Sequence, residues 1–264
     1  MNRYLTIASF LIFGFTLQDS KFKPVRSIPT TSSYFTTDDL GNCYLVRNDV
    51  LEKYDSEGNL LKNLSNKALG NITSVDAHDP LKILLFYKSF EQIAFIDNML
   101  AGSGNLISLD AVGYPQASLV CASHNNGFWI YNTPGSELIR FDQNLTKTQQ
   151  TGNIMQLTGV KVNPNMITEQ NNLLFLNDTA TGILVFDIYG TYSKTIPIKG
   201  LSNFQVSNDH IQYLQGGRLR SYDLKTLEEH DISLPATDVL NARTEKEKLY
   251  LLKQKSLDIY STSK

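Results

Sequence analysis

The sequence predicts an all-β fold, a six-bladed β-propeller in which the last blade is closed by an N-terminal strand. Three observations support this. A strand motif recurs six times at near-regular spacing, and short apolar strands alternate with turns rich in Gly, Asn and Asp. The last repeat also lacks one strand, while an apolar segment near the start of the chain belongs to no repeat.

The recurring motif is an apolar strand that ends in an aromatic or branched residue, usually followed by Asp. The copies end at Asp55, Asp97, Asp142, Asp187, Asp223 and, without the Asp, at Tyr260. Successive copies lie 42, 45, 45, 36 and 38 residues apart. Four-stranded propeller blades have repeats of this length.

Each repeat is expected to contain four short strands. The clearest strands of the first repeat are 43–48, 50–55 and 60–64, and those of the fourth are 163–170, 173–178, 183–189 and 191–198. A single sheet of this kind has two exposed edges, whereas six sheets stacked around an axis bury their faces and leave only short edges.

The last repeat supplies three strands, at 237–243, 248–254 and 256–262. The segment from Phe22 to Ile28 is apolar and is predicted to be the missing outer strand. Pro24 is compatible with this place because proline is tolerated on edge strands. The propeller is thus predicted to be a single domain spanning residues 21–264.

The first 18 residues are predicted to be a signal peptide. Arg3 provides a positive start, and an apolar run of 13 residues extends from Leu5 to Leu17. That run is shorter than the roughly 20 residues of a membrane-spanning helix. The alternatives are a core strand or an uncleaved anchor. Cleavage would give a periplasmic or otherwise exported protein with no integral membrane span in the mature chain.

Composition argues against some classes of partner. The formal net charge is −2 and no Lys/Arg cluster occurs, so no nucleic-acid or anionic-lipid surface is expected. Cys43 and Cys121 fall in apolar strands of the first and third repeats, which are not neighbours in a ring. A disulfide needs close Cα atoms, so both are predicted to be buried thiols.

Some segments resemble a known repeat family. The segment 173–196 (LLFLNDTATGILVFDIYGTYSKTI) resembles an NHL-type repeat, and 38–46 and 53–64 resemble the two halves of another copy. The resemblance to NHL-repeat and TolB-like propellers implies the six-bladed architecture. Exported propellers of this kind commonly serve as subunits of envelope or secretion assemblies.

The polar residues of the repeats favour structural roles. The five Asp residues each precede a turn, where a carboxylate can cap backbone amides. His78, His124 and His210 fall at turns between first and second strands and are expected to be solvated; His230 lies in an outer strand. We therefore predict no metal, no cofactor and no catalytic residues. Candidate channel-lining residues are Asp76, Ser123, Asn163, Asn165 and Asn208.

These features predict a non-enzymatic interaction scaffold or accessory subunit of a bacterial envelope or secretion machine, with another envelope protein as its partner. Candidate partner-binding residues in loops are Phe90, Tyr114, Pro115 and Pro134. Rigid apolar loop residues are common in interface hot spots. Alternatively, Tyr114 wedges between blades and Phe90 caps its own sheet.

The alternative function is a propeller lyase or hydrolase, or a carbohydrate-binding propeller, that uses the axial channel. No small-molecule ligand can be inferred from the sequence. Three or more carboxylates or histidines converging within a few ångströms on the axis would favour an enzyme, and an axis lined by small and apolar groups would favour a scaffold.

Overall fold

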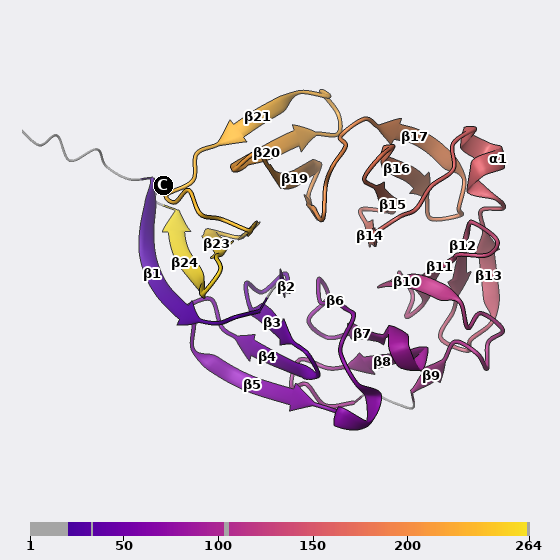
Figure 1. Ribbon diagram of the computed structural model, residues 1–264, viewed down its shortest axis with the longest axis horizontal. Coiled ribbons are helices and arrows are strands. Elements are labelled where there is room, and N and C mark those ends of the chain that lie inside the picture. Colours follow the sequence, from indigo (N-terminus) through magenta and orange to yellow (C-terminus); the bar gives the residue numbers. More distant parts are fainter. Residues whose placement is uncertain (1–20, 33, 103–105, 263–264) are drawn as a thin grey trace, which may run out of the picture.

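Six four-stranded antiparallel sheets stand around a central axis in the computed structural model (Figure 1). The structure describes residues 21–32, 34–102 and 106–262. This arrangement is the six-bladed β-propeller that the sequence predicts. The expected signal peptide, residues 1–18, lies outside the described residues. In the part of the chain that is described, no helix is long and apolar enough to cross a bilayer.

The strands of the first three blades follow one another along the chain. Blade 1 consists of β2 (Tyr34–Thr37), β3 (Cys43–Arg47), β4 (Val50–Tyr54) and β5 (Leu60–Ser65). Blade 2 consists of β6 (Ser74–Asp76), β7 (Ile83–Tyr87), β8 (Gln92–Ile96) and β9 (Ile107–Ser108). Blade 3 consists of β10 (Ala117–Ala122), β11 (Phe128–Asn132), β12 (Glu137–Phe141) and β13 (Lys147–Gln150).

The remaining blades include the one that closes the ring. Blade 4 consists of β14 (Met166–Gln170), β15 (Leu173–Asp178), β16 (Gly182–Asp187) and β17 (Tyr192–Ile196). Blade 5 consists of β18 (Gln205–Ser207), β19 (His210–Gln215), β20 (Arg218–Asp223) and β21 (Glu229–Ile232). Blade 6 consists of β22 (Asn241–Glu245), β23 (Lys248–Leu252), β24 (Ser256–Thr262) and β1 (Phe22–Pro29).

Strand β1 forms the outer edge of blade 6, as predicted from the incomplete last repeat. It runs antiparallel to β24, with Phe22 opposite Thr262 and Ile28 opposite Leu257. Ser27 Oγ donates a hydrogen bond to Asp258 Oδ1 at 2.5 Å. The two ends of the described chain are thereby held in one sheet, as Figure 1 shows on the left of the ring.

The core lies between the blades. Side chains from neighbouring sheets interdigitate there: Phe86 of β7 packs in one cluster with Phe128 and Ile130 of β11. Middle strands such as β15 and β16 are buried on both faces and are therefore almost continuously apolar. Outer strands such as β13 and β21 are mostly exposed and polar. This gradient explains why the middle strands were the easiest to predict.

Two sequence expectations are tested by local structure. Cys43 and Cys121 are buried free thiols, as predicted. The first strand of blade 6 begins at Asn241 rather than at 237; Leu240, just before it, is 58% exposed. Short helices also occur in connections: α1 (Ile154–Thr158), η1 (Lys67–Leu69) and η2 (Lys88–Phe90).

The antiparallel order gives the ring two faces. If the strands of a blade are called A to D from the axis outwards, the A–B and C–D turns lie on one face, here the AB/CD face. The B–C turns and the connections between blades lie on the other, the BC/DA face. His78 and His124 belong to the AB/CD face, whereas Phe90 and helix α1 belong to the BC/DA face.

Candidate functional site

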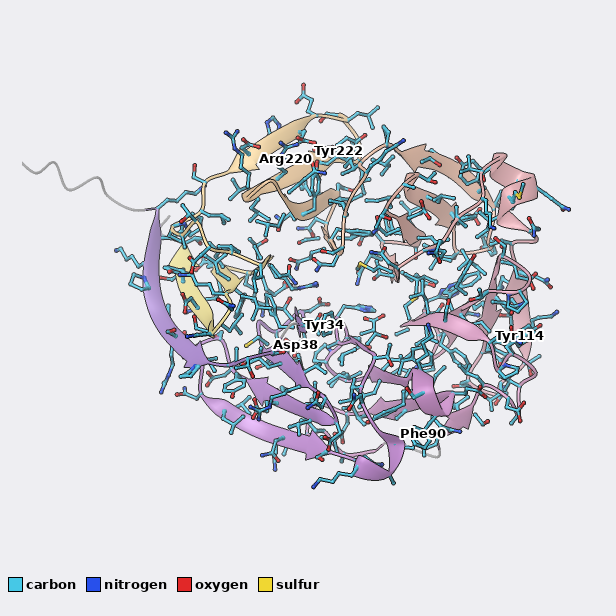
Figure 2. The ribbon with its side chains drawn as sticks, in the orientation of Figure 1. Tyr34, Asp38, Phe90, Tyr114, Arg220 and Tyr222 are labelled. Atoms are coloured by element: carbon cyan, nitrogen blue, oxygen red, sulfur yellow. The ribbon has the colours of Figure 1, made fainter. Side chains whose placement is uncertain are left out.

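The innermost strands of the blades surround an axial cavity of about 820 Å³. Its wall is largely polar, with threonine, asparagine and glutamine side chains from several blades. The charged residues that line it are Asp39, Asp76, His78, Arg243, Glu245 and Lys246. Tyr34, on β2, lies near the central opening in Figure 2.

Asp76 and His78 form an ion pair at the end of β6. His78 Nδ1 lies 2.8 Å from Asp76 Oδ1, and the backbone N–H of Ala122 donates to Asp76 Oδ2 at 2.9 Å. Burial alone would lower the pKa of His78, but the Asp76 carboxylate raises it to about 9. Burial would likewise raise the pKa of Asp76, but the His78 charge and the hydrogen bonds keep it below its ordinary value. Both groups are therefore charged at neutral pH.

Arg243 of blade 6 and Tyr34 of blade 1 belong to the same polar wall. Arg243 Nε donates to Thr37 Oγ1 at 3.1 Å, which links blade 6 to blade 1. The Tyr34 hydroxyl donates to the Val75 carbonyl at 2.9 Å, which links blade 1 to blade 2. Burial lowers the pKa of Arg243 and raises that of Tyr34.

The channel-lining candidates are placed in different surroundings. Asp76, Asn165 and Asn208 line the axial cavity. Ser123 instead lines a second, neighbouring pocket of about 320 Å³ on the AB/CD face. Asn163 borders neither cavity; its backbone N–H donates to Asp178 Oδ2 at 2.6 Å.

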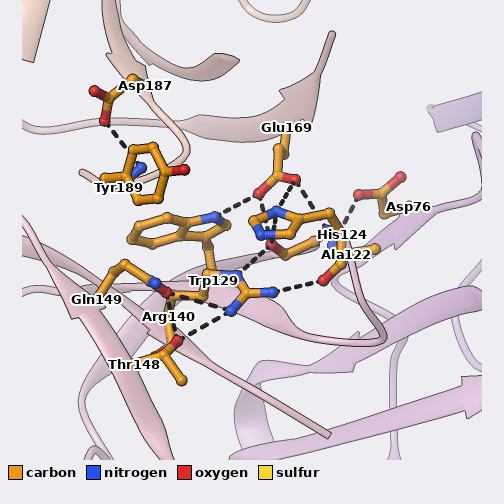
Figure 3. A network of polar contacts seen from close by, with 11 residues as sticks. Asp76, Ala122, His124, Trp129, Arg140, Thr148, Gln149, Glu169, Asp187 and Tyr189 are labelled. Carbon is orange, nitrogen blue, oxygen red and sulfur yellow. Dashed lines mark hydrogen bonds and ion pairs between the residues drawn. The ribbon is translucent and has the colours of Figure 1, made fainter. Parts of the chain in front are cut away.

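Glu169, on β14, is the centre of a polar network beside that second pocket (Figure 3). Its Oε2 accepts from Ser123 Oγ and Trp129 Nε1, both at 2.6 Å. Its Oε1 accepts from the backbone N–H of His124 and lies 2.9 Å from His124 Nδ1. Burial would raise the pKa of Glu169, but these hydrogen bonds hold it below its ordinary value. The carboxylate thus joins blade 4 to blade 3.

Arg140 completes this network from the other side. Its Nε donates to Ser123 Oγ at 2.7 Å, and its Nη2 donates to the His124 carbonyl at 2.5 Å. Nη1 donates to Thr148 Oγ1 at 3.0 Å. The guanidinium therefore fixes the loop that carries His124, as Figure 3 shows.

His78 and His124 are thus not freely solvated turn residues. Their side chains are only 31% and 30% exposed, and each is paired with a carboxylate from a first strand. His210 is 43% exposed and lies 3.8 Å from Asp223, and His230 is 68% exposed on β21. Sequence spacing identified their turns but gave no sign of their partners.

The second pocket also borders Lys82, whose ammonium group lies 4.3 Å from the centre of the Phe95 ring. The Nζ atom is buried and has no hydrogen-bond partner within the described chain. Burial lowers the pKa of Lys82 to about 8. Across the described residues, no three His, Cys, Asp or Glu side chains are grouped so that they could hold a metal ion.

The repeated Asp residues cap turns, as expected from sequence. Each accepts hydrogen bonds from backbone amides two to four residues further along, for example Asp55 from Glu57 and Asn59 at 3.0 and 2.8 Å. Asp142 and Asp187 do the same. Asp38, which sequence reasoning did not single out, does so in an A–B turn while fully buried.

The partner-binding candidates lie on the BC/DA face with different exposures. Phe90, in η2, is 51% exposed, whereas Tyr114 packs edge-on against Phe141 with ring centres 5.7 Å apart. Pro115 is half-buried and Pro134 is exposed. Figure 2 shows Phe90 and Tyr114 towards the outer rim.

Helix α1 adds apolar residues to this face that sequence reasoning missed. Met155 and Leu157 are 52% and 47% exposed. Asn153 caps the helix by accepting from Gln156 N, and Gly159 ends it with φ 73°. An Asn and a Gly bracketing a short apolar run are helix boundary signals, so this pattern was available in the sequence.

No family model matches the sequence, and no curated protein matches it. Solved structures share the fold. The WD40 domain of Pan2 from Neurospora crassa has a TM-score of 0.62 at 8% identity, over 93% of this chain and 97% of that one. Virginiamycin B lyase from Staphylococcus aureus has a TM-score of 0.61 at 10% identity, over 91% and 99%.

A chain of the Mitotic Checkpoint Complex has a TM-score of 0.63 at 9% identity, over 100% of this chain and 99% of that one. The similar structures thus include propellers from protein assemblies and lyases alike. Identities near 10% show the shared fold and leave the site to be argued from its own residues.

Proposed function

We propose that this protein is an exported, non-enzymatic interaction scaffold, an accessory subunit of a bacterial envelope or secretion assembly, and that it binds another envelope protein through its BC/DA face. The observation that carries the proposal is the set of exposed apolar side chains on short, well-ordered connections of that face. Phe90, Met155 and Leu157 are each about half exposed.

The backbone under these side chains is held in place. The N–H of Glu91 donates to the Lys88 carbonyl at 3.1 Å and closes η2, and Asn153 caps α1. Apolar side chains on pre-ordered segments lose little conformational entropy when a partner covers them. Tyr114 and Pro115 lie in the connection between blades 2 and 3, on the same face, and would border the contact. Pro134, in a B–C turn of blade 3, would add a rigid corner.

Two of the interior carboxylates, those of Asp76 and Glu169, are occupied by structural contacts, which supports a role without turnover. Both oxygens of Asp76 and both oxygens of Glu169 accept hydrogen bonds or ion pairs from protein groups. A general acid or base must instead be free to exchange a proton with a substrate. The similar structures that come from protein assemblies are in keeping with a scaffold.

Affinity purification from the native host tests the proposed face. We expect a triple variant, Phe90→Ser, Met155→Ser and Leu157→Ser, to lose the protein that co-purifies with the unsubstituted chain. A variant with Leu81→Ser and Tyr189→Ser is the matched control, because these side chains are 71% and 69% exposed on the AB/CD face. Circular dichroism of both variants checks that they are folded. A partner that both variants keep, or both lose, would contradict the proposed face.

Export is part of the proposal and has a separate test. We expect N-terminal sequencing of the protein recovered from the envelope fraction to begin close to Asp19. A mature chain that retains Met1 would rule out cleavage of residues 1–18 and with it this route of export.

A further inference from the structure

Arg243 extends from β22 to the axial cavity with much of its hydrogen-bonding capacity unused. Within the described chain its only side-chain hydrogen bond is from Nε to Thr37. No carboxylate oxygen of a described residue lies within 4.0 Å of the guanidinium. The terminal nitrogens Nη1 and Nη2 therefore lack protein acceptors there, and neither is sealed from solvent.

None of the nearby carboxylates of the described chain forms an ion pair with Arg243. Asp76 is neutralised by His78 at 2.8 Å. Glu245 accepts from Gln205 Nε2 at 3.2 Å, and Asp39 is exposed at the AB/CD end of the cavity. Arginine stays protonated in proteins, so the charge of Arg243 cannot be removed by loss of a proton. A half-buried cation without an ion-pair partner costs free energy unless an anion joins it.

We infer that Arg243 anchors a binding site in the axial cavity for a small organic oxyanion, a carboxylate or a phosphate ester. The planar guanidinium fork matches the two oxygens of such a group and can bind both at once. A cavity of about 820 Å³ is in the range that holds small-molecule ligands. The polar wall, including Asn165, Thr168 and Gln212, can bind the rest of the molecule.

The same wall restricts the charge of the ligand. Glu245 and Asp39 both border the cavity, and their carboxylates repel a second negative group. The site therefore suits an oxyanion with one anionic group better than a polyanion. This inference is independent of the BC/DA face, because it concerns residues of the axis.

Thermal unfolding of the purified protein tests the site. Propionate, inorganic phosphate and citrate are added separately at matched ionic strength, with sodium chloride as the reference. We expect propionate or phosphate to raise the midpoint with increasing concentration, as a ligand of the folded state does. Multivalent anions such as phosphate and citrate also stabilise folded proteins by exclusion from the surface, so the rise assigned to binding is the part that the variant Arg243→Gln lacks. The relative shifts of propionate and phosphate distinguish the carboxylate from the phosphate class.

Substitution of the arginine supplies the decisive comparison. Arg243→Gln is expected to weaken binding about tenfold or more, because charged hydrogen bonds are lost. In chloride alone its midpoint is expected to change little, because the loss of the hydrogen bond to Thr37 is offset by the removal of an unpaired charge. Arg218→Gln is the control, since Arg218 is exposed on blade 5, away from the axis, and should keep the full response.

Three results would overturn the inference. One is the absence of any midpoint rise above chloride in the unsubstituted chain. The second is an equal rise in the Arg243→Gln variant. The third is a lowered midpoint of that variant in chloride alone, with its anion response intact, which would assign Arg243 to the support of the blade 6 to blade 1 contact.

Discussion

At the scale of single residues, two largely buried carboxylates join neighbouring blades. Asp76 of blade 2 accepts from the backbone of Ala122 in blade 3, and Glu169 of blade 4 accepts from Ser123, His124 and Trp129 of blade 3. Buried polar groups are stable only when their hydrogen bonds are made. The paired carboxylates therefore fix how the blades sit against one another.

The His78–Asp76 pair predicts a pH dependence of stability. The pKa of His78 rises from 6.5 to about 9 on folding. Folding therefore takes up a proton, and the stabilisation is complete below about pH 6.5 and is lost as the pH rises through about 9. We expect the unsubstituted chain to lose more unfolding free energy between about pH 6 and pH 9.5 than the variant His78→Gln.

Denaturant unfolding at a series of pH values measures this difference, and NMR titration of the imidazole measures the pKa itself. His230→Gln is the control, because His230 is 68% exposed on an outer strand. Parallel pH profiles for the unsubstituted chain and the His78→Gln variant would contradict the prediction.

At the scale of elements, the C–D turns reuse one backbone shape with different residues. The fourth turn residue is Gly58 in blade 1 and Gly190 in blade 4, both with positive φ. In blades 2 and 3 it is Leu100 and Leu145, with φ 59° and 62°. Leucine in this conformation is strained, because its Cβ crowds the backbone. Leu100 is 5% exposed and packs in the core between blades 1 and 2, whereas Leu145 is 40% exposed.

This contrast gives a prediction from two substitutions with the same backbone conformation. Leu145→Gly is expected to leave stability unchanged or raise it by up to about 1 kcal/mol, because relief of strain offsets the entropy of glycine. Leu100→Gly is expected to lower stability by about 2 kcal/mol or more, because buried side-chain volume is lost. Denaturant unfolding measures both. Equal losses in the two variants would show that the exposed leucine is held by packing after all.

At the scale of the whole molecule, the ring is closed by a strand that serves two interblade cores. Phe22 of β1 packs with the cluster between blades 5 and 6, and Ile28 packs with the cluster between blades 6 and 1. Both side chains are almost fully buried, 6% and 5% exposed. Closure therefore depends on packing as well as on the hydrogen bonds of the strand.

We expect a chain that starts at residue 30 to unfold at a markedly lower temperature than one that starts at residue 21, because the edge of β24 and both clusters become exposed.

The double variant Phe22→Ala and Ile28→Ala is expected to lose several kcal/mol of unfolding free energy, at about 2–5 kcal/mol per buried large side chain. Lys23→Ala, exposed on the same strand, is the control. Thermal and denaturant unfolding measure these effects, and an unchanged midpoint in the truncated chain would mean that β1 is a dispensable tail.

The sequence by itself determined the number of blades, the closure by the N-terminal strand, the turn-capping Asp residues and the two free thiols. These depend on local patterns, namely the alternation of apolar strands with Asn, Asp and Gly turns, and on the count of strands in the last repeat. The strand limits were most accurate where both faces are buried, as in β15, which was predicted at 173–178. They were least accurate at the first strand of blade 6.

Only the tertiary structure decided which polar residues meet. The distance between Glu169 and His124 in the sequence gives no hint of their 2.9 Å contact, because the packing of blade 4 against blade 3 brings them together. The same holds for Arg243 and Thr37, which lie 206 positions apart and are joined by closure of the ring. Spacing along the chain determines the strands and turns. The packing of one blade against the next determines the partner of each charged residue and which residues line the axial cavity.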